Sequence, residues 1–348
     1  MTQAEPAAAV DFGDIRTAFV HGLSKAGKRE CSKEVAKATV NCIRKIVAQE
    51  KYENIDELLS VFREHLCFSM RLRPSEIVVR NIFLIAMKLA REENTRALYG
   101  VDKELGNPYD SLNTLWKQDD SSKNENSSGK KMRKGLIAAI KEVLTEVETS
   151  RECIVGRVSD VFQLNDTILT HCLSSSPTLK LFIDAARKTT KMRRVLSVSP
   201  CSDDDCPDYA DPISLRDVAT CMSDATKVLL ACAAVFPDGS CLAPAGSLSI
   251  AHAACRHSVP VHVVAAFYKI APYFAPDAAR AVESQSCTAL PVKLAENLRY
   301  RNILSPLFDV IPAHLLTLYI SNSGAVLPSH MYRFITDYYH PEDLTEQS

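Results

Sequence analysis

The residues best suited to chemistry are Thr170, His171 and Cys172, which follow a short apolar run and precede three serines. The run predicts a buried strand over Thr167–Thr170, and open α/β sheets place ligands at the carboxyl ends of their strands. A thiol beside an imidazole can be an activated nucleophile. Adjacent strand residues point to opposite faces, however, so His171 and Cys172 need not touch. A nucleophilic pair and an ordinary strand end are both compatible with this pattern.

Neither the acidic nor the cysteine-rich part of the sequence predicts a metal site. Carboxylates gather between Asp203 and Asp211, but this segment lacks the interleaved glycine and closing glutamate of a calcium loop. A solvated loop is the simpler interpretation. Twelve cysteines are present, and none forms a C-x-x-C pair. We expect reduced, mostly buried thiols that act as small apolar side chains.

Composition argues against several classes of function. The glycines form neither the G-x-G-x-x-G loop of dinucleotide-binding folds nor a P-loop, so we expect no nucleotide cofactor. The 41 basic and 42 acidic residues leave neither half with the basic excess that nucleic-acid binding needs. The longest apolar runs, Val228–Phe236 and Val259–Phe267, fall far short of the ~20 residues of a membrane helix. Without a secretory signal pattern at the N-terminus, a cytoplasmic location is expected.

The elements that position these residues fall into two parts. Three amphipathic helices are predicted first: Ser32–Gln49 with Ser32 as cap, a second behind the capping box Asn54 and Glu57, and a third from Pro74 or Ser75 to about Glu93. The polar segment Asp119–Lys131 predicts a flexible loop, and a connecting helix follows over residues 132–150. After residue 150, apolar runs alternate with helical patterns, which is typical of βαβ units.

The predicted fold is therefore an α+β two-part chain. An N-terminal α-helical bundle (1–118) precedes the loop (119–131) and connecting helix (132–150), and an α/β Rossmann-like domain with a mainly parallel sheet spans 151–348. In that domain the expected strands are Thr167–Thr170, Val195–Val198, Val228–Ala233 and Val259–Phe267. The expected helices are Pro177–Lys188 and Gly246–Arg256. Two short segments follow, Pro312–Ser321 and a helical one over Pro328–Tyr339.

The C-terminal run PLFDVIPAHLLTLYISNSGAVLPSHMYRFITDYYHPEDL, from Pro306 to Leu344, resembles one family closely. This is the family of alpha, beta and delta regulatory subunits of eukaryotic translation initiation factor 2B, and the run is most similar to the beta subunits. The segment CRHSVP at Cys255–Pro260 and the helical first half extend the resemblance over nearly the whole chain. The polar loop, the short segment after Cys201 and the cysteine load indicate a divergent member.

The resemblance implies a regulatory, non-catalytic subunit of a guanine-nucleotide exchange factor. Such a subunit pairs directly with delta and assembles with alpha, gamma and epsilon. It has the alpha and gamma subunits of initiation factor 2 as partners and helps to sense phosphorylation of that alpha subunit. The catalytic domain lies in epsilon. No cofactor, metal, nucleic acid or membrane is implied.

The same family is related to methylthioribose-1-phosphate isomerases, which use a cysteine and an aspartate. By motif, ILTHC places the isomerase cysteine at Cys172, whereas the acid position reads Ala233. An aldose–ketose isomerisation needs a positioned acid and base, so Cys172 is interpreted as vestigial. A sugar-phosphate isomerase is the alternative function, and a pocket that binds such a ligand without turnover is a further one.

The tyrosine-rich tail predicts either a protein contact surface or a core edge. Pairing with delta would bury it, and the candidate interface residues are Phe308, Asp309, Tyr319, Asn322, Tyr332, Arg333 and Tyr338.

Overall fold

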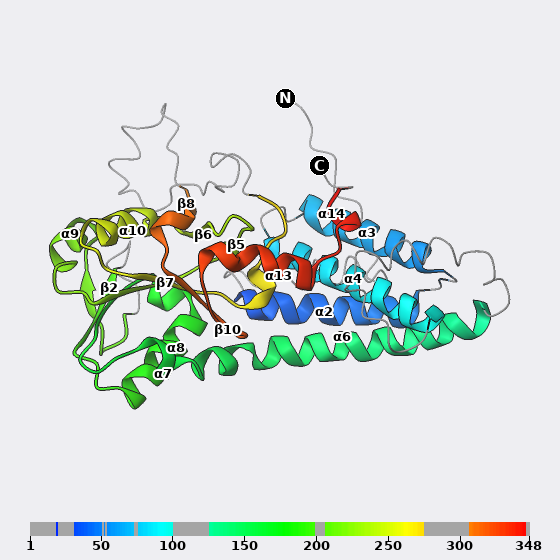
Figure 1. The fold of residues 1–348 in the computed structure, drawn as a ribbon, viewed down its shortest axis with the longest axis horizontal. Coiled ribbons are helices and arrows are strands. Elements are labelled where there is room, and N and C mark those ends of the chain that lie inside the picture. The colour runs from blue at the N-terminus through cyan, green and yellow to red at the C-terminus, as the bar shows by residue number, and fades with distance from the viewer. Residues whose placement is uncertain are drawn as a thin grey trace, which may run out of the picture. The chain divides into compact units, whose positions relative to one another are not determined.

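The computed structural model describes residues 19, 31–50, 52, 54–72, 76–99, 125–198, 206–274 and 306–345 (Figure 1). The chain divides into two compact units. The helical unit contains the residues up to Glu148 together with those from Tyr338 onward, and the α/β unit is Thr149–Asp337. The residues from 338 onward therefore belong with the helices, whereas the sequence assigned them to the α/β domain.

The helical unit is built from long amphipathic helices, and helix α2 covers the predicted span Ser32–Gln49. The others are α3 (Ile55–Leu72), α4 (Ile77–Tyr99), α6 (Glu125–Val155), whose final turns belong to the α/β unit, and the short α14 (Glu342–Thr345). The predicted cap is wrong for α2, because Cys31 is the N-cap residue and no side chain caps the helix. Asn54 immediately precedes α3 as predicted, and Pro74 and Ser75 lie outside the described residues.

Helix α6 is longer than the sequence predicts. It begins at Glu125, so the expectation of a loop as far as Lys131 is wrong for residues 125–131, while residues 119–124 lie outside the described part. Helices α2 and α6 lie side by side in opposite directions (Figure 1). Lys37 Nζ is 2.6 Å from Glu148 Oε1 at one end, and Arg133 donates to the Ala48 carbonyl at the other. Helical propensity and this packing outweigh the polar composition at the start of α6.

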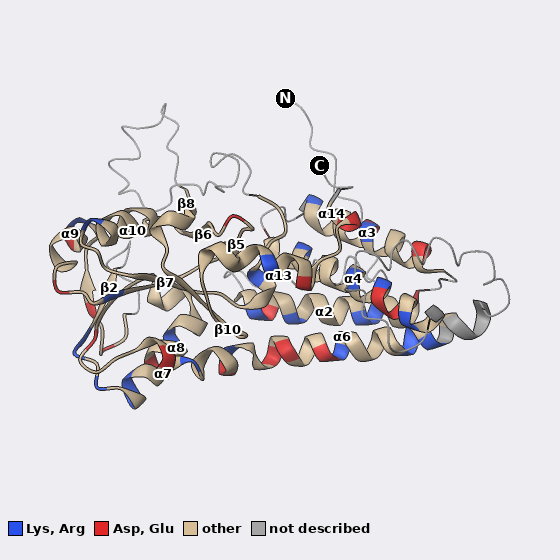
Figure 2. Ribbon diagram, in the orientation of Figure 1, with Lys and Arg blue, Asp and Glu red and all other residues tan. Residues whose placement is uncertain are grey.

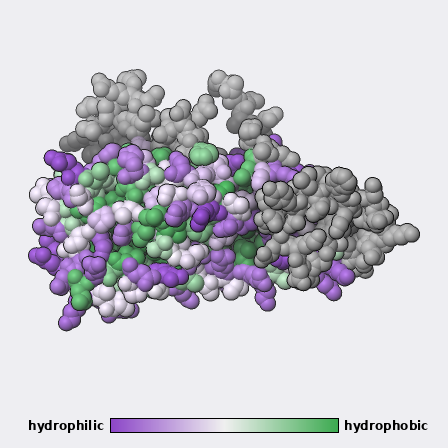
Figure 3. Space-filling model, viewed as in Figure 1, coloured by the Kyte–Doolittle hydropathy of each residue, from purple (hydrophilic) through white to green (hydrophobic). Residues whose placement is uncertain are grey.

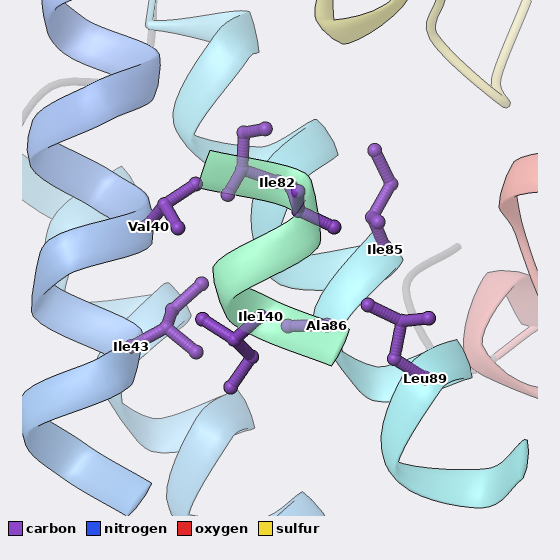
Figure 4. Close-up of a pocket in the computed structure, with 8 residues that line it drawn as sticks. Val40, Ile43, Ile82, Ile85, Ala86, Leu89 and Ile140 are labelled. Atoms are coloured by element: carbon purple, nitrogen blue, oxygen red, sulfur yellow. The ribbon is translucent and has the colours of Figure 1, made fainter. Parts of the chain in front are cut away.

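An apolar pocket lies among α2, α4 and α6 (Figure 4). Eight apolar side chains line it: Val40, Ile43, Ile82, Ile85, Ala86, Leu89, Ile140 and Val143. Because neither a polar atom nor a charge converges on it, this pocket belongs to the hydrophobic core between three helices.

Replacing Ile140 by alanine is expected to destabilise the helical unit by about 3 kcal/mol, because it removes a buried side chain and enlarges the pocket. Ile137 is the matched control, since it lies on the same helix and is 38% exposed. Its alanine variant should lose less than about 1 kcal/mol. Urea unfolding monitored by circular dichroism measures the loss of stability in both variants. Equal losses in the two variants would contradict the packing of α6 described here.

The α/β unit is built on a seven-stranded sheet with the order β10-β9-β7-β4-β1-β2-β3. All neighbours are parallel except β10, which runs antiparallel to β9. The strands are β1 (Thr167–His171), β2 (Arg194–Val198), β3 (Asp211–Ile213), β4 (Lys227–Ala231), β7 (Val261–Val264), β9 (Leu318–Ser321) and β10 (Gly324–Val326). An antiparallel sheet of β5 (Ala234–Val235), β6 (Cys241–Pro244) and β8 (Phe308–Ile311) adjoins it in sequence. The predicted α/β fold with a mainly parallel sheet is confirmed.

Helices connect the strands as in doubly wound folds. They are α8 (Pro177–Thr189), α9 (Val218–Cys221) and α10 (Ser247–Arg256), whereas α7 (Val158–Val161) precedes the first strand and α13 (Met331–Tyr338) follows the last. From β1 the chain passes through α8 to β2, and from β4 it passes through α10 to β7, in the opposite direction along the sheet. Right-handed crossovers then place α8 and α10 on opposite faces. The strand order reverses between β1 and β4, which is where such folds bind ligands.

One sheet face packs on α10 through a shared core. Leu169, Val228 and Val263 from the strands join Ile250 and Ala254 from the helix, all 1% exposed or less. Alternation along the strands puts Thr170, Leu229 and His262 in one row on the other face. Each of these three side chains is also buried, so the central strands are covered on both faces.

Candidate functional site

The carboxyl ends of β1 and β4 meet at the point where the strand order reverses. Cys172 follows β1 directly, and Ala233 follows β4 two residues after its last residue, Ala231. The structure thus brings the two sequence-predicted positions to adjacent strand ends. Ala233 donates its backbone N–H to the Leu242 carbonyl at 2.7 Å and carries no acidic group. The candidate site therefore has the expected thiol but lacks the expected acid at this position.

His171 and Cys172 are in contact, which is one of the two arrangements that the sequence left open. Cys172 adopts a left-handed conformation with φ 49° and ψ 50°, which ends the strand and turns its side chain back. As a result, Cys172 Sγ lies 3.5 Å from His171 Nε2. The other ring nitrogen, Nδ1, lies 3.1 Å from Ser247 Oγ at the start of α10. Strand periodicity does not reveal this pair because Cys172 has already left the strand.

The imidazole of His171 is neutral near pH 7. Burial lowers its pKa to about 4, although the carboxylate of Asp309 acts in the opposite direction. A thiol is activated when the neighbouring imidazole takes up its proton and stabilises the thiolate as an ion pair. An imidazole whose pKa is lowered to about 4 is a weak base, so His171 does little to activate Cys172. The pair is better described as a part-buried hydrogen-bonded contact at a strand end.

Asp309 occupies the beginning of helix α10. Its Oδ2 accepts hydrogen bonds from the backbone N–H groups of Gly246 at 2.7 Å and Leu248 at 3.2 Å. Free amides and the helix dipole at such an end are suited to binding a phosphate. In this chain the carboxylate of Asp309 takes these donors. The sequence assigned Asp309 to a subunit interface, and no local pattern indicated that it caps a helix 61 to 63 positions earlier.

Gly246 allows α10 to approach the histidine closely. Its φ is 99°, and a Cβ at this position would lie 3.3 Å from His171 Nε2. Lys269 at the carboxyl side of β7 donates to the Cys232 carbonyl at 2.6 Å and is therefore engaged with the backbone. The sequence analysis did not assign roles to Ser247 or Lys269, because neither lies in a pattern with a defined spacing.

Only two of the seven predicted interface residues are exposed. Tyr332 is 56% exposed, and Arg333 beside it on α13 is also exposed. Tyr319 is completely buried and donates to the Gly239 carbonyl at 2.8 Å, so its assignment to an interface is wrong. The sequence left two alternatives for the tyrosine-rich tail, a protein contact surface and a core edge. Tyr319 belongs to the core.

The other predicted interface residues are partly buried. Asn322 accepts a hydrogen bond from the backbone N–H of Phe267 at 3.1 Å. Phe308 opens strand β8 of the antiparallel sheet. Tyr338 lies in the helical unit, where its hydroxyl is 3.5 Å from Glu146 Oε1. Asn322 and Tyr338 thus make intrachain contacts that a sequence pattern cannot reveal.

The remaining sequence candidates do not form a site among the residues that the structure describes. Asp203, Asp204 and Asp205 lie outside that part, and Asp211 pairs with Arg194 at 2.6 Å on the surface. No group of three or more potential metal ligands occurs in the described ranges. None of the ten described cysteines is in a disulfide, but only Cys42, Cys232 and Cys241 are buried, so the expectation of mostly buried thiols is wrong for these ten.

Figure 2 shows basic and acidic residues interspersed along α2, α4 and α6. In the part of the chain with described structure, no helix has the length and apolar character needed to cross a bilayer.

A helical unit followed by a doubly wound α/β unit, with a cysteine at the reversal of strand order, defines the class of this chain. The family model described as "Initiation factor 2 subunit family" matches residues 28–200 and 213–328. The chain belongs to this initiation factor 2 subunit family. The resemblance stated from the sequence is thereby confirmed.

Two relatives carry the name translation initiation factor eIF2B subunit beta. The protein from Schizosaccharomyces pombe is 24% identical over 363 residues, which cover 89% of this chain and 92% of the relative. The protein from Dictyostelium discoideum is 28% identical over 226 residues, which cover 62% of this chain and 58% of the relative.

Solved structures share the fold. The crystal structure of eIF2B beta from Chaetomium thermophilum has a TM-score of 0.70 at 19% identity, covering 94% of this chain and 92% of that one. A chain of the tetrameric eIF2B-beta2-delta2 complex from the same organism has a TM-score of 0.68 at 19% identity, with 93% and 94% covered. The 5-methylthioribose 1-phosphate isomerase from Pyrococcus horikoshii has a TM-score of 0.55 at 14% identity, with 94% and 88% covered.

Proposed function

We propose that the chain is the regulatory, non-catalytic beta subunit of eIF2B, the exchange factor that promotes GDP/GTP exchange on initiation factor 2. The observation that carries the proposal is the match to a named beta subunit over 89% of this chain and 92% of the relative. Both parts of the fold are included in that span. The isomerase structure also covers 94% of this chain, so the sequence match to a named beta subunit, and not the extent of the shared fold, favours the beta subunit.

The chemistry of the strand ends supports a non-catalytic role. Ala233 stands at the acid position, burial makes His171 a weak base by lowering its pKa to about 4, and Asp309 takes the helix-end amides that a phosphate would need. An isomerisation requires a proton donor and acceptor placed at the substrate. As the resemblance to the beta subunits implies, we assign catalysis of exchange to another subunit, epsilon, and assign recognition and assembly to this chain.

The partners proposed for the chain are the other subunits of the factor and its substrate protein. Delta is the direct partner, by analogy with the tetrameric eIF2B-beta2-delta2 complex, one chain of which shares this fold. Alpha, gamma and epsilon complete the complex in the cytosol. The alpha and gamma subunits of initiation factor 2 are the proteins on which it acts, and sensing of alpha phosphorylation is part of the proposed role.

Affinity isolation of the tagged full chain from its own cell extract tests this function. Recovery of delta and epsilon together with GDP release from initiation factor 2 is the expected result. Recovery of the chain alone, without exchange activity, would overturn the proposal.

The surface of α13 is the proposed delta contact within the α/β unit. Tyr332 and Arg333 are exposed there, and Leu327 just before this region is 48% exposed. Tyrosine and arginine are the residue types most enriched where interfaces derive their affinity. Figure 3 shows that apolar and polar residues are mixed on the face that it displays, as in transient or hetero-oligomeric surfaces.

The combined substitution of Tyr332→Ala and Arg333→Glu should weaken binding of purified delta at least tenfold, measured by titration calorimetry. Leu181→Ala on α8 is the matched control, because Leu181 is 46% exposed and lies outside the proposed surface. Its affinity should match that of the unmodified chain. Equal binding by all three chains would remove α13 from the interface.

The second candidate function is a sugar-phosphate isomerase, which the contact between Cys172 and His171 favours. A direct assay with methylthioribose 1-phosphate decides it. Turnover that disappears in Cys172→Ala would establish the isomerase. Absence of turnover in the purified full chain is the outcome expected from Ala233 and the neutral imidazole.

A further inference from the structure

The helical unit ends in a segment that returns to it from far along the chain, Tyr338–Thr345, called the returning segment below. Arg91 on α4 donates from Nη2 to Asp343 Oδ1 at 2.9 Å and from Nε to Oδ2 at 3.2 Å. Its third nitrogen, Nη1, lies 2.6 Å from Glu342 Oε2. Arg63 on α3 adds a longer contact of 3.5 Å to Asp343 Oδ1. One guanidinium therefore holds two consecutive carboxylates.

The two carboxylates differ sharply in burial. The side chain of Asp343 is 1% exposed, whereas that of Glu342 is 66% exposed. A buried carboxylate is tolerated only when it is paired and hydrogen-bonded. Asp343 is therefore the residue whose position depends on the arginines, and Glu342 adds a solvent-screened contact.

Local backbone structure presents both carboxylates on one side. The N–H of Asp343 donates to the His340 carbonyl at 3.2 Å, and that of Leu344 donates to the Pro341 carbonyl at 3.1 Å. These bonds form the turn that becomes α14. Tyr339, just before the turn, is 2% exposed. The returning segment is thus fixed by one buried aromatic ring and one buried carboxylate.

We propose that Arg63 and Arg91 form a carboxylate-binding site on the helical unit, that its ligand is the buried carboxylate of Asp343 in the same chain, and that the filled site clasps the returning segment to α3 and α4. The planar fork of Arg91 suits a bidentate carboxylate, a geometry that a lysine ammonium does not reproduce. The carboxylate of Asp343 therefore serves the helical unit and, being buried, is withheld from partner proteins.

Hydrogen exchange in the full-length chain tests the clasp through the backbone amides of Asp343 and Leu344. Asp343→Asn should speed their exchange at least tenfold, because the buried charge pair is lost. Arg91→Lys should do the same, since it keeps the charge but not the fork. Glu342→Gln is the matched control on the same guanidinium and should change exchange less than threefold. In 1 M NaCl the unmodified chain should keep its protection, because the Asp343 pair is buried.

Exchange in α10 reports separately on the α/β unit and should be the same in every variant. If Asp343→Asn also speeds hydrogen exchange in α10, that variant disturbs the α/β unit as well. The test then rests on Arg91→Lys, provided that its α10 amides keep their protection. Unchanged exchange of Asp343 and Leu344 in both variants would overturn the proposal, as would an equal effect of Glu342→Gln. None of these outcomes depends on delta binding or exchange activity.

Discussion

Acidification from pH 7 to pH 5 is expected to lower the free energy of unfolding of the α/β unit by about 4 kcal/mol, because two histidines are buried in the neutral form. Burial lowers the pKa of His171 to about 4. Burial, with a contribution from the nearby ammonium of Lys227, lowers the pKa of His262 to about 4 as well. Their ordinary value is 6.5.

The sign follows from proton binding. Between about pH 6.5 and pH 4 the unfolded chain takes up a proton at each histidine that the folded chain does not. The contribution of each neutral histidine to the free energy of unfolding is therefore fully present above pH 6.5 and is lost as the pH falls toward 4. At pH 5 the loss is about 2 kcal/mol per histidine. The pKa of Asp166 is lowered below its ordinary 3.8, so its own contribution is lost only at more acidic pH.

Urea unfolding at pH 7 and at pH 5, monitored by proteolysis of the α/β unit, measures the loss in the free energy of unfolding. In His262→Gln the loss should be halved, because only His171 remains. His252→Gln is the matched control, since His252 is exposed on α10, and its loss should equal that of the unmodified chain. A stability difference below about 1 kcal/mol between pH 7 and pH 5 would contradict the neutral, buried state of both rings.

Replacing Asp166 by alanine is expected to destabilise the α/β unit by about 3 to 5 kcal/mol. Asp166 lies at the start of β1 and accepts hydrogen bonds from Lys227 Nζ at 2.6 Å, the Gln163 N–H at 2.8 Å and Thr226 Oγ1 at 2.9 Å. Although burial acts to raise the pKa of Asp166, these hydrogen bonds hold it below its ordinary value. The loss is large because the Lys227 side chain, 15% exposed, keeps its charge without a partner.

The ion pair of Arg194 and Asp211 provides the matched control. Its 2.6 Å contact is equally short, but its side chains are 56% and 51% exposed. Asp211→Ala should cost less than about 1 kcal/mol, as exposed pairs do. Urea unfolding compares the two variants directly. Similar costs for Asp166→Ala and Asp211→Ala would show that burial does not decide the energy of the Asp166 pair.

Much of the fold could be predicted from the sequence, because its elements have strong periodicity. The span Ser32–Gln49 is helical at the predicted bounds, and β1 and α8 begin where the apolar runs and Pro177 indicated. Helix ends were less predictable. The first residues of α6 are polar, and their helical state depends on propagation from the apolar turns that follow.

The candidate site was predictable only in part. The motif placed Cys172 and Ala233 at neighbouring strand ends, but the contact of Cys172 with His171 required a left-handed residue that periodicity does not indicate. Tyr319 lies in a tyrosine-rich segment whose composition is typical of a contact surface. Its hydroxyl nevertheless donates a hydrogen bond to the Gly239 carbonyl inside the α/β unit. Such contacts join residues distant in sequence, where local patterns carry no information.

The return of Asp343 to the helices has a consequence for biosynthesis. Arg91 and Asp343 are separated by 252 positions, so the ribosome makes α3 and α4 long before their buried carboxylate partner exists. At typical elongation rates of roughly 5–20 residues per second, this interval lasts on the order of ten seconds or more. During that time the nascent helices lack Asp343 and the ring of Tyr339. The helical unit, although first to be translated, can complete its packing only after the α/β unit has emerged.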